Sequence, residues 1–418
     1  MELFQGKVDK LAFGGDGVLR TDGFVIFIPF TAPGDEIEGT ITSQKKRYAR
    51  GEVLQILKPS PQRTAPPCPY FGTCGGCQLQ HIQYEAQTKA KQEMVAEAFE
   101  RIGKVEELSV LSTHPSPSPW AYRRHVTLHL REVGEMFQVG YYALDNQTLL
   151  PIHQCPIFAS PDDEVFRQLY PLISLLKPKK GDSGRVILLK REEGGYLLAL
   201  QLPHRLEGLP TLLKQSPFVG TLVKIGQTVE GVGTTDLFYH YGGLNFEFSP
   251  FAFIQNHPDQ SRWIYEQIIA TVEQGPVIDL YCGVGVTSLL LAQKGLDVVG
   301  IESNPKAIEL AKRNAERLRI SAEFICADAG AALKKVVQSK KPAWIVANPP
   351  REGLDRRVVK AICDAKVPGL IYVSCMPSTI ARDTQLLGEA GYQVTVCQPV
   401  DMFPQTGHVE TLAVYRLL

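Results

Sequence analysis

Hydrophobic and polar residues alternate in short runs near the start of the chain. Runs rich in valine, isoleucine and phenylalanine lie at 24–28, 36–41 and 51–56. Turn-forming glycine, proline and aspartate residues gather at 14–17, 21–23 and 32–35. Short strands separated by such turns are typical of a small antiparallel barrel. The pattern therefore predicts an OB-like β-barrel over residues 1–58.

The pattern changes after a proline-rich linker. Residues 84–102 follow the spacing of an amphipathic helix, and Gly103 is placed to end it. The chain from there to residue 245 is rich in strand-like runs and contains no internal repeat. This predicts a central α+β domain over residues 59–245.

Strand-like and helical stretches alternate regularly in the last part of the chain. Buried strand-like runs lie at 277–281, 297–302, 323–326, 344–347 and 371–374, with helical stretches between them. Such alternation predicts a doubly wound, mostly parallel sheet. We therefore expect a Rossmann-like α/β domain over residues 246–418, in a chain whose 418 residues suit several domains.

Composition and charge narrow the class of protein. Hydrophobic residues make up 44% of the chain and charged residues 21%, as in ordinary globular proteins. The 44 basic and 44 acidic residues cancel, so any nucleic-acid-binding surface must be local. No hydrophobic run approaches a membrane span, and Met1–Lys7 lacks a secretory core. We expect a cytoplasmic protein with no membrane association.

The cysteines form the first candidate site. In a reducing compartment, nine cysteines favour metal binding or catalysis over disulfides. Cys68, Cys74 and Cys77 have the spacing C-x5-C-x2-C, and Cys155 is a fourth candidate. Four thiolates suit either a tetrahedral zinc ion or an iron–sulfur cluster, and the spacing alone does not choose between them.

A nucleoside-binding pattern opens the C-terminal domain. The strand that ends at Tyr281 runs into a glycine loop containing Gly283, and Glu302 ends the next strand. An acid in that place can bond ribose hydroxyls while the loop lets a nucleoside approach the backbone. NAD would use a similar loop, but Ser288 stands where its third glycine is expected. Asp328 and Asn348 follow the ends of later strands.

A further cysteine stands at the end of the strand 371–374. Cys375 is followed two residues later by Pro377, which suits the first turn of a helix. Open α/β sheets bind ligands at this end of their strands. A lone cysteine is more often a small buried hydrophobe than a nucleophile, so both interpretations stay open at this point.

Several segments together resemble the RNA uracil-C5 methyltransferase family. The segments 14–35 and 68–81 resemble the RNA-binding TRAM barrel and the family's cluster segment, and Cys155-Pro156 its distant fourth ligand. The segments 279–285, 302, 328 and 348–350 resemble S-adenosylmethionine-dependent methyltransferases. Three more segments resemble family motifs: 249–256 resembles the F-x-Q-x-N segment, 374–377 resembles S-C-N-P, and 401–410 resembles D-x-F-P-x-T-x-H-V-E.

This resemblance implies a function and a set of site residues. Carbon 5 of uridine in a structured RNA would be methylated through a covalent adduct of carbon 6, with Cys375 as nucleophile and Glu410 as base (EC class 2.1.1). It implies that S-adenosylmethionine is held by Gln255, Tyr281, Gly283, Glu302, Asp328 and Asn348. It favours a [4Fe-4S] cluster over zinc, bound by Cys68, Cys74, Cys77 and Cys155.

The resemblance also implies partners. A TRAM-like barrel beside a cluster is more similar to the family's 23S ribosomal RNA members than to its transfer RNA members, so we expect ribosomal RNA and a monomeric enzyme. The cationic and aromatic segments 45–50 and 120–125 suit stacking and phosphate contact with RNA. The second of these is similar to a family segment that lies near the bound RNA.

Two departures from the family pattern leave rivals open. Asn348 replaces the usual aspartate, and Met376 replaces the usual asparagine. Asn348-Pro349-Pro350 is typical of enzymes that methylate amino groups, although Arg351 stands where those have an aromatic residue. The rivals are therefore an amino-group RNA or protein methyltransferase with Cys375 merely packed, and an RNA-binding module that has lost catalysis.

Overall fold

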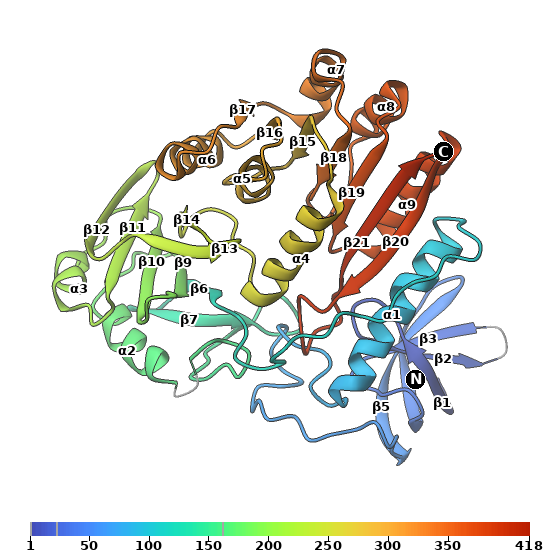
Figure 1. Ribbon diagram of the computed structural model, residues 1–418. Coiled ribbons are helices and arrows are strands. Elements are labelled where there is room, and N and C mark those ends of the chain that lie inside the picture. The colour runs from blue at the N-terminus through green and yellow to red at the C-terminus, as the bar shows by residue number, and fades with distance from the viewer. Residues whose placement is uncertain (1, 22–23, 161–162) are drawn as a thin grey trace.

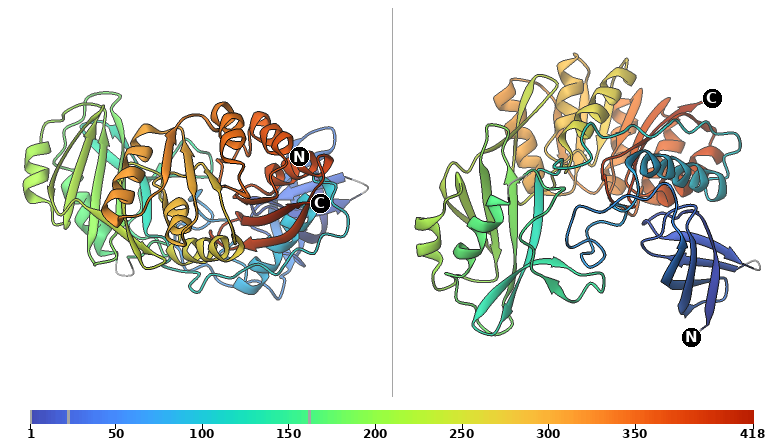
Figure 2. Two further views of the ribbon diagram at one scale, coloured as in Figure 1. Left: turned by 45° about the horizontal axis from the view of Figure 1, so that its top comes forward. Right: turned by 90° about the horizontal axis from the view of Figure 1, so that it is seen from below.

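The computed structural model describes residues 2–21, 24–160 and 163–418 (Figure 1). Residues 22–23 of the turn expected at 21–23 lie outside the described residues. Figure 2 shows the chain as an N-terminal barrel, a central sheet and a C-terminal sheet flanked by helices, with the barrel and the central sheet at opposite ends.

The N-terminal unit is a closed barrel with strand order β1-β2-β3-β5-β4. Its strands are β1 (Leu3–Leu11), β2 (Gly17–Thr21), β3 (Phe24–Ile28), β4 (Glu36–Gln44) and β5 (Tyr48–Lys58). The Phe4 ring fills the interior over Gly39 and Gly51, where a Cβ atom would come within 2.4 Å and 2.6 Å of that ring. The predicted barrel is confirmed.

The central unit is a seven-stranded sheet with order β12-β11-β10-β9-β6-β7-β8. Its strands are β6 (His125–Val133), β7 (Met136–Tyr142), β8 (Leu149–Leu150), β9 (Ser183–Lys190), β10 (Tyr196–Leu202), β11 (Gly220–Ile225) and β12 (Thr228–Gly233). One face packs on α2 (Glu164–Ile173) and α3 (Leu209–Gln215). Part of the other face packs on the hairpin β13 (Leu237–Tyr241) and β14 (Leu244–Phe248), which lies toward the C-terminal unit (Figure 1).

The helix α1 (Tyr84–Arg101) does not join the central sheet. Met94 packs with Leu11 of the barrel, and Phe99 belongs to the core of the C-terminal unit. The expected amphipathic helix is therefore present, but its hydrophobic face joins the barrel to the C-terminal unit.

The C-terminal unit is a seven-stranded sheet with order β17-β16-β15-β18-β19-β21-β20. The strands are β15 (Val277–Leu280), β16 (Val298–Glu302), β17 (Glu323–Cys326), β18 (Trp344–Ala347), β19 (Gly369–Ser374), β20 (Tyr392–Val400) and β21 (Glu410–Leu417). The first five in sheet order pair in parallel, and β21 is antiparallel to both neighbours. The predicted Rossmann-like sheet is confirmed, and it places the ends of β15, β16, β18 and β19 along one edge.

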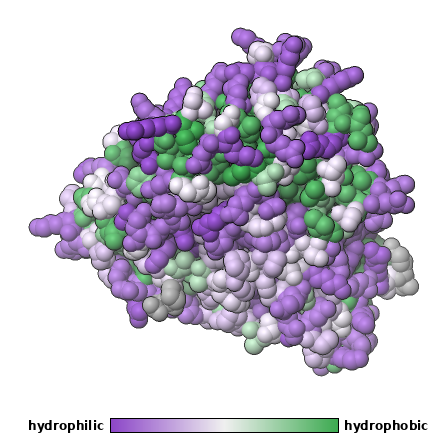
Figure 3. All heavy atoms as spheres, in the orientation of Figure 1, coloured by the Kyte–Doolittle hydropathy of each residue, from purple (hydrophilic) through white to green (hydrophobic). Residues whose placement is uncertain are grey.

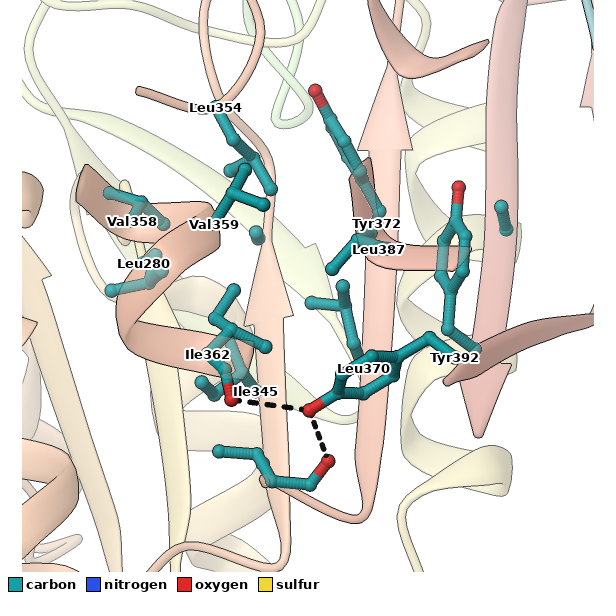
Figure 4. Packing of buried hydrophobic residues seen from close by; sticks show 14 of the residues in the cluster. Leu280, Ile345, Leu354, Val358, Val359, Ile362, Leu370, Tyr372, Leu387 and Tyr392 are labelled. Carbon is teal, nitrogen blue, oxygen red and sulfur yellow. Dashed lines mark hydrogen bonds between the residues drawn. The ribbon is translucent and has the colours of Figure 1, made fainter. Parts of the chain in front are cut away.

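Helices cover both faces of this sheet because alternate strand residues point to opposite sides. The helices are α4 (Pro258–Thr271), α5 (Val286–Gln293), α6 (Pro305–Leu318), α7 (Ala329–Lys340), α8 (Arg356–Ala365) and α9 (Pro377–Glu389). Figure 4 shows Leu280 and Leu370 packed against Ile362 of α8. The Tyr392 hydroxyl donates to the carbonyl oxygens of Ile362 at 3.2 Å and Val367 at 2.8 Å, so this buried phenol has partners.

The surface is mixed in character. On the face shown in Figure 3, hydrophobic residues gather mostly in the upper part, over the C-terminal unit. Among the described residues, no helix combines the length and the hydrophobicity that a membrane span requires.

Candidate active site

Two chemically active side chains meet where β19 ends and β21 begins. Ser374, the last residue of β19, pairs with Thr411 of β21. This antiparallel register places the next residue, Cys375, beside Glu410. Cys375 is half-buried at the edge of the sheet, whereas Glu410 is almost fully buried. The structure therefore brings the two predicted catalytic side chains together.

The surroundings of this pair favour its uncharged form. Burial raises the pKa of Glu410 to about 8. Burial also raises the pKa of Cys375, the charge of Glu410 raises it further, and the charge and hydrogen bond of Arg351 lower it. Because the carboxylate and the thiolate repel each other, one negative charge beside Arg351 is easier to hold than two.

Arg351 is a site residue that the sequence did not single out. It follows β18 in the loop Asn348-Pro349-Pro350-Arg351, and its side chain lies close enough to Cys375 to form a hydrogen bond. It also helps to lower the pKa of His408, which burial brings to about 4, so that imidazole is neutral at pH 7. The sequence did contain a signal for Arg351, because this cation follows a pair of prolines at the edge of the sheet where ligands bind.

The loop that leads to Glu410 is fixed by a buried ion pair. Nζ of Lys91 donates to Oδ1 of Asp401 at 2.5 Å, and both side chains are fully buried. The Tyr84 hydroxyl donates to Oδ2 of Asp401 at 2.8 Å, and Lys91 also donates to the carbonyl oxygen of Phe403 at 2.9 Å. Two residues of α1 thus hold the first part of this loop.

The same loop also contacts the cysteine-rich segment and the barrel. The backbone amides of Gln78 and Leu79 donate to the carbonyl oxygen of Gln405 at 3.1 Å and 3.0 Å. The Gly14 amide donates to the carbonyl oxygen of Gly407 at 3.0 Å, and a Cβ atom on Gly407 would come within 2.2 Å of the Gly14 backbone. Parts of the chain that are far apart in sequence therefore shape one wall of the site.

Four of the six residues expected to hold a cofactor line one cavity. These are Gln255, Tyr281, Gly283 and Asn348. A fifth, Glu302, ends β16 and accepts hydrogen bonds from the amides of Gly283 at 3.3 Å and Asn304 at 2.8 Å.

The sixth residue, Asp328, does not line that cavity. Its carboxylate caps α7 by accepting from the Ala331 amide at 3.0 Å, and it lies 3.1 Å from Nη2 of Arg357. Its charge nevertheless helps to raise the pKa of Tyr281, which places it near the cavity.

Ser288 explains why the glycine loop differs from a dinucleotide-binding loop. Its hydroxyl donates to the buried Oδ2 of Asp279 at 2.6 Å. Burial raises the pKa of Asp279 to about 7, so the hydrogen bond satisfies an otherwise costly polar group. A glycine at 288 would remove this bond between the strand β15 and the helix α5.

The segment 120–125 was expected to contact RNA, but much of it is engaged inside the protein. Tyr122 is buried, donates to the carbonyl oxygen of Pro404 at 3.1 Å and stacks on His257. Nη1 of Arg124 donates to Glu192 at 2.7 Å. These side chains support the fold around the site.

Cys68, Cys74, Cys77 and Cys155 line one small cavity, together with Arg123 and Tyr141. None of these four cysteines forms a disulfide, and each of the four residues is partly exposed. Within residues 2–21, 24–160 and 163–418, no group of three or more His, Cys, Asp or Glu side chains is arranged to hold a metal ion. The structure therefore gathers the four predicted ligands without showing the cluster.

Comparisons with known proteins decide the family. The sequence model of the tRNA (uracil-5-)-methyltransferase family matches residues 240–416, and that of the TRAM domain of tRNA (uracil(54)-C(5))-methyltransferase matches residues 4–62. An uncharacterized RNA methyltransferase of Protochlamydia amoebophila is 42% identical over 98% of this chain and 96% of its own length. The chain belongs to the RNA (uracil-5-)-methyltransferase family.

Further relatives are similar to this RNA methyltransferase along its whole length. An uncharacterized RNA methyltransferase of Halalkalibacterium halodurans is 34% identical over 100% of the chain and 97% of its own length. The crystal structure of Pyrococcus abyssi tRNA (uracil-54, C5)-methyltransferase with S-adenosyl-L-homocysteine has a TM-score of 0.78 and 26% identity, covering 99% of this chain and 100% of that one. The methyltransferase is therefore S-adenosylmethionine-dependent and acts on RNA.

Proposed function

We propose that this methyltransferase transfers a methyl group to carbon 5 of a uridine through a covalent bond between Cys375 and carbon 6. The observation that carries the proposal is the proximity of Cys375 to Glu410 at the edge of the sheet, next to the paired residues Ser374 and Thr411. Asn348, which directly follows the neighbouring strand β18, lines the cofactor cavity, so the thiol stands one strand away from it. A half-buried thiol beside a carboxyl group suits catalysis better than packing.

Each of the two side chains has one task in this reaction. The Cys375 thiol first loses its proton to solvent, and the thiolate then forms a bond from Sγ to carbon 6 while the double-bond electrons move to carbon 5 and the neighbouring carbonyl oxygen. S-adenosylmethionine, when bound, supplies a methyl group on a positively charged sulfur. After transfer, Glu410 takes the proton from carbon 5, the double bond re-forms and the bond between Sγ and carbon 6 breaks. The products are 5-methyluridine, S-adenosylhomocysteine and the free thiolate.

The cofactor cavity offers groups that fit S-adenosylmethionine. Glu302 would bond the ribose hydroxyls, and the glycine loop leaves its backbone open, since a Cβ atom on Gly283 would meet nothing within 4 Å. Gln255 and Asn348 add neutral polar groups to the lining of this cavity.

Replacing Glu302 with alanine tests this assignment. Hydrogen bonds to a charged group contribute about 1.5–3 kcal/mol, so affinity for S-adenosylmethionine should fall by roughly 10- to 100-fold. Isothermal titration calorimetry without RNA measures this directly. Glu309→Ala, a change in the middle of α6, is the control, and equal affinity of all three proteins would contradict the assignment.

A groove of about 870 Å³ gives RNA a path to the thiol. It lies between the barrel and α1 and reaches Pro377 and Ser378, directly after the catalytic loop. Its walls carry the aromatic residues Phe13, Phe24, Phe27 and Tyr48 and the cations Lys10, Arg20, Arg47 and Arg101. Tyr48 is 40% exposed, so its ring can stack on an unpaired base.

Replacing Tyr48 with alanine should weaken RNA binding about tenfold, because stacking on an aromatic side chain contributes roughly 1–3 kcal/mol per base. Fluorescence anisotropy with a labelled oligouridylate measures the affinity. Tyr48→Phe keeps the ring and should bind like the wild type. If both variants bind equally well, this groove is not the RNA path.

The four gathered cysteines support a [4Fe-4S] cluster. In a cubane each thiolate binds a different iron, so the ligands lie farther apart than around a single zinc ion. The four cysteines line one cavity, as ligands that each hold a different iron of one cluster would. We therefore assign Cys68, Cys74, Cys77 and Cys155 as its ligands.

Anaerobically purified protein should contain iron and acid-labile sulfide, and Cys155→Ala should lose most of both. Cys363→Ala, a half-buried cysteine of α8, should keep them. Zinc in place of iron in the wild-type protein would overturn the cluster assignment.

Two classes of RNA are candidate substrates. The sequence favours ribosomal RNA, whereas the Pyrococcus abyssi relative is a tRNA methyltransferase, which does not favour that choice. Mapping 5-methyluridine in ribosomal and transfer RNA from cells with and without the gene tests both. Loss of the modification from neither RNA would contradict the uridine assignment itself.

A further inference from the structure

One face of the central sheet is covered by the hairpin β13–β14 only in part. Ile187, Leu189 and Leu197 pack under that hairpin. Beyond it the same face is open and forms a hollow of about 730 Å³. The side chains that line it change from hydrophobic to polar and cationic, among them His129, Arg131 and Arg185.

The strand register arranges these polar side chains in a row. His129 of β6 pairs with Arg185 of β9, Arg185 pairs with Gln201 of β10, and Gln201 pairs with Lys224 of β11. Directly paired residues share a face of the sheet. With strands about 4.8 Å apart, the row crosses four strands and spans about 14 Å.

Aromatic rings lie at both ends of this row. The Tyr142 ring lies 4.3 Å from the His129 ring, and the Arg131 guanidinium lies 5.4 Å from the centre of the Tyr142 ring. At the other end, Nζ of Lys224 lies 5.5 Å from the centre of the Phe251 ring. Phe251 belongs to the segment that leads to Gln255 in the cofactor cavity, so the row runs toward the catalytic unit.

The arginines of the row are available to an anion. In the described part of the chain, neither Arg131 nor Arg185 pairs with a carboxylate; Arg131 donates to the Gln147 carbonyl oxygen and the Tyr142 hydroxyl, both at 3.1 Å. The two acids that line the hollow accept hydrogen bonds from backbone amides. Glu132 accepts from the Gly181 amide at 2.9 Å, and Asp182 accepts from the Lys179 amide at 2.8 Å.

The imidazole of the row is suited to stacking. Burial, then the charges of Arg185 and Arg131, hold the pKa of His129 below its ordinary value. The ring is therefore neutral at pH 7 and adds an aromatic face to that of Tyr142. Cations and flat rings side by side are the two kinds of group that bind single-stranded RNA.

We propose that this row, defined as His129, Arg131, Tyr142, Arg185, Gln201 and Lys224, is a second RNA-binding site that holds a part of the RNA substrate distant from the target uridine. Arg131, Arg185 and Lys224 contact phosphates, while Tyr142 and His129 stack on an unpaired base. The proposal rests on the proposed function, since it assumes an RNA substrate. The net charge of the chain is zero, so contact with a polyanion needs a local group of cations such as this row.

The test compares a long and a short RNA on the full-length protein. The long probe is a labelled oligouridylate of about 30 nucleotides, and the short probe is a pentanucleotide containing 5-fluorouridine, most of which the active site itself would hold. Arg131→Ala/Arg185→Ala should weaken long-probe binding about tenfold. In this double variant, the slope of log affinity against log salt concentration should be smaller by roughly 1.4, because each of the two lost contacts with a single-strand phosphate contributes about 0.7.

Adduct formation between Cys375 and the short probe should remain at the wild-type rate, which separates this proposal from the function of the active site. Arg131→Lys/Arg185→Lys should restore the salt dependence. The matched control is Arg262→Ala/Arg313→Ala, which removes the same charge from α4 and α6, where both arginines pair with acids.

Three outcomes would overturn the proposal. Unchanged long-probe binding would assign the row to a partner other than RNA. Equal weakening by the control would mean that only net charge matters. Loss of adduct formation together with long-probe binding would show a general defect rather than a separate site. If even the wild-type protein forms no adduct, the covalent mechanism fails while the long-probe comparison still tests the row.

Discussion

Replacing Cys375 with alanine is expected to abolish methylation of RNA while leaving the binding of S-adenosylmethionine intact. Without the thiol, carbon 5 of uracil cannot gain the electron density that it needs to take a methyl group. Removing a nucleophile costs on the order of 10⁴- to 10⁶-fold in rate. Transfer of tritiated methyl groups from S-adenosylmethionine to RNA measures the loss, and calorimetry confirms that the cofactor still binds.

The control for this variant is Cys363→Ala, which removes a thiol from the helix α8. It should methylate RNA at the wild-type rate. Denaturing gels with 5-fluorouridine-containing RNA give a second readout, since only proteins with Cys375 should form a covalent complex. Activity that survives in Cys375→Ala would instead favour a methyltransferase that acts on an amino group through Asn348.

The barrel and the C-terminal sheet could be predicted because each of their strands is recognisable from its own short stretch of sequence. Trp344–Ala347 and residues 370–373 are buried on both faces and therefore form continuous hydrophobic runs in the sequence. The pairing of Cys375 with Glu410 needed the family motifs. The two residues are far apart in sequence, and only the antiparallel position of β21 brings them together.

The residues that fix the site from outside could not be predicted in the same way. The positions of α1 that are buried include Gln87 and Lys91, which break its hydrophobic stripe. That break is a signal, because a buried lysine requires a partner, but the partner Asp401 lies on a distant loop that no local pattern connects to α1. The polar row of the central sheet is equally hidden, since it exists only through the register of four strands.

Replacing Glu410 with glutamine is expected to trap the enzyme on its RNA. Burial raises the pKa of Glu410 to about 8 from an ordinary value of 4.5, so the free enzyme holds a neutral carboxyl group at pH 7. The neutral amide of glutamine copies that state. It adds no negative charge beside the thiol, so the Cys375 thiolate should still attack carbon 6 and the methyl group should still be transferred.

The next step fails in this variant because an amide cannot accept the proton on carbon 5. A methylated covalent complex of protein and natural RNA should therefore accumulate, while multiple turnover falls by about 10²- to 10⁴-fold, the usual contribution of a general base. Denaturing gels with a tritiated methyl group show the complex. Glu389→Gln, at the end of α9, is the control and should accumulate none.

The raised pKa of Glu410 also predicts how turnover changes with pH. Below about 8 the base is protonated in the free enzyme, so the wild-type rate of product release should rise with pH up to that value and then level off. The glutamine variant should lose that rise. The free energy of unfolding changes with pH in the opposite direction. The raised pKa of Glu410 means that the folded state binds the proton more tightly than the unfolded state, so wild-type stability falls between pH 4.5 and about 8. The glutamine variant, which has no proton to lose, should be at least as stable at pH 8, so its loss of turnover cannot come from unfolding. Rapid turnover with no trapped complex would show that another group removes the proton.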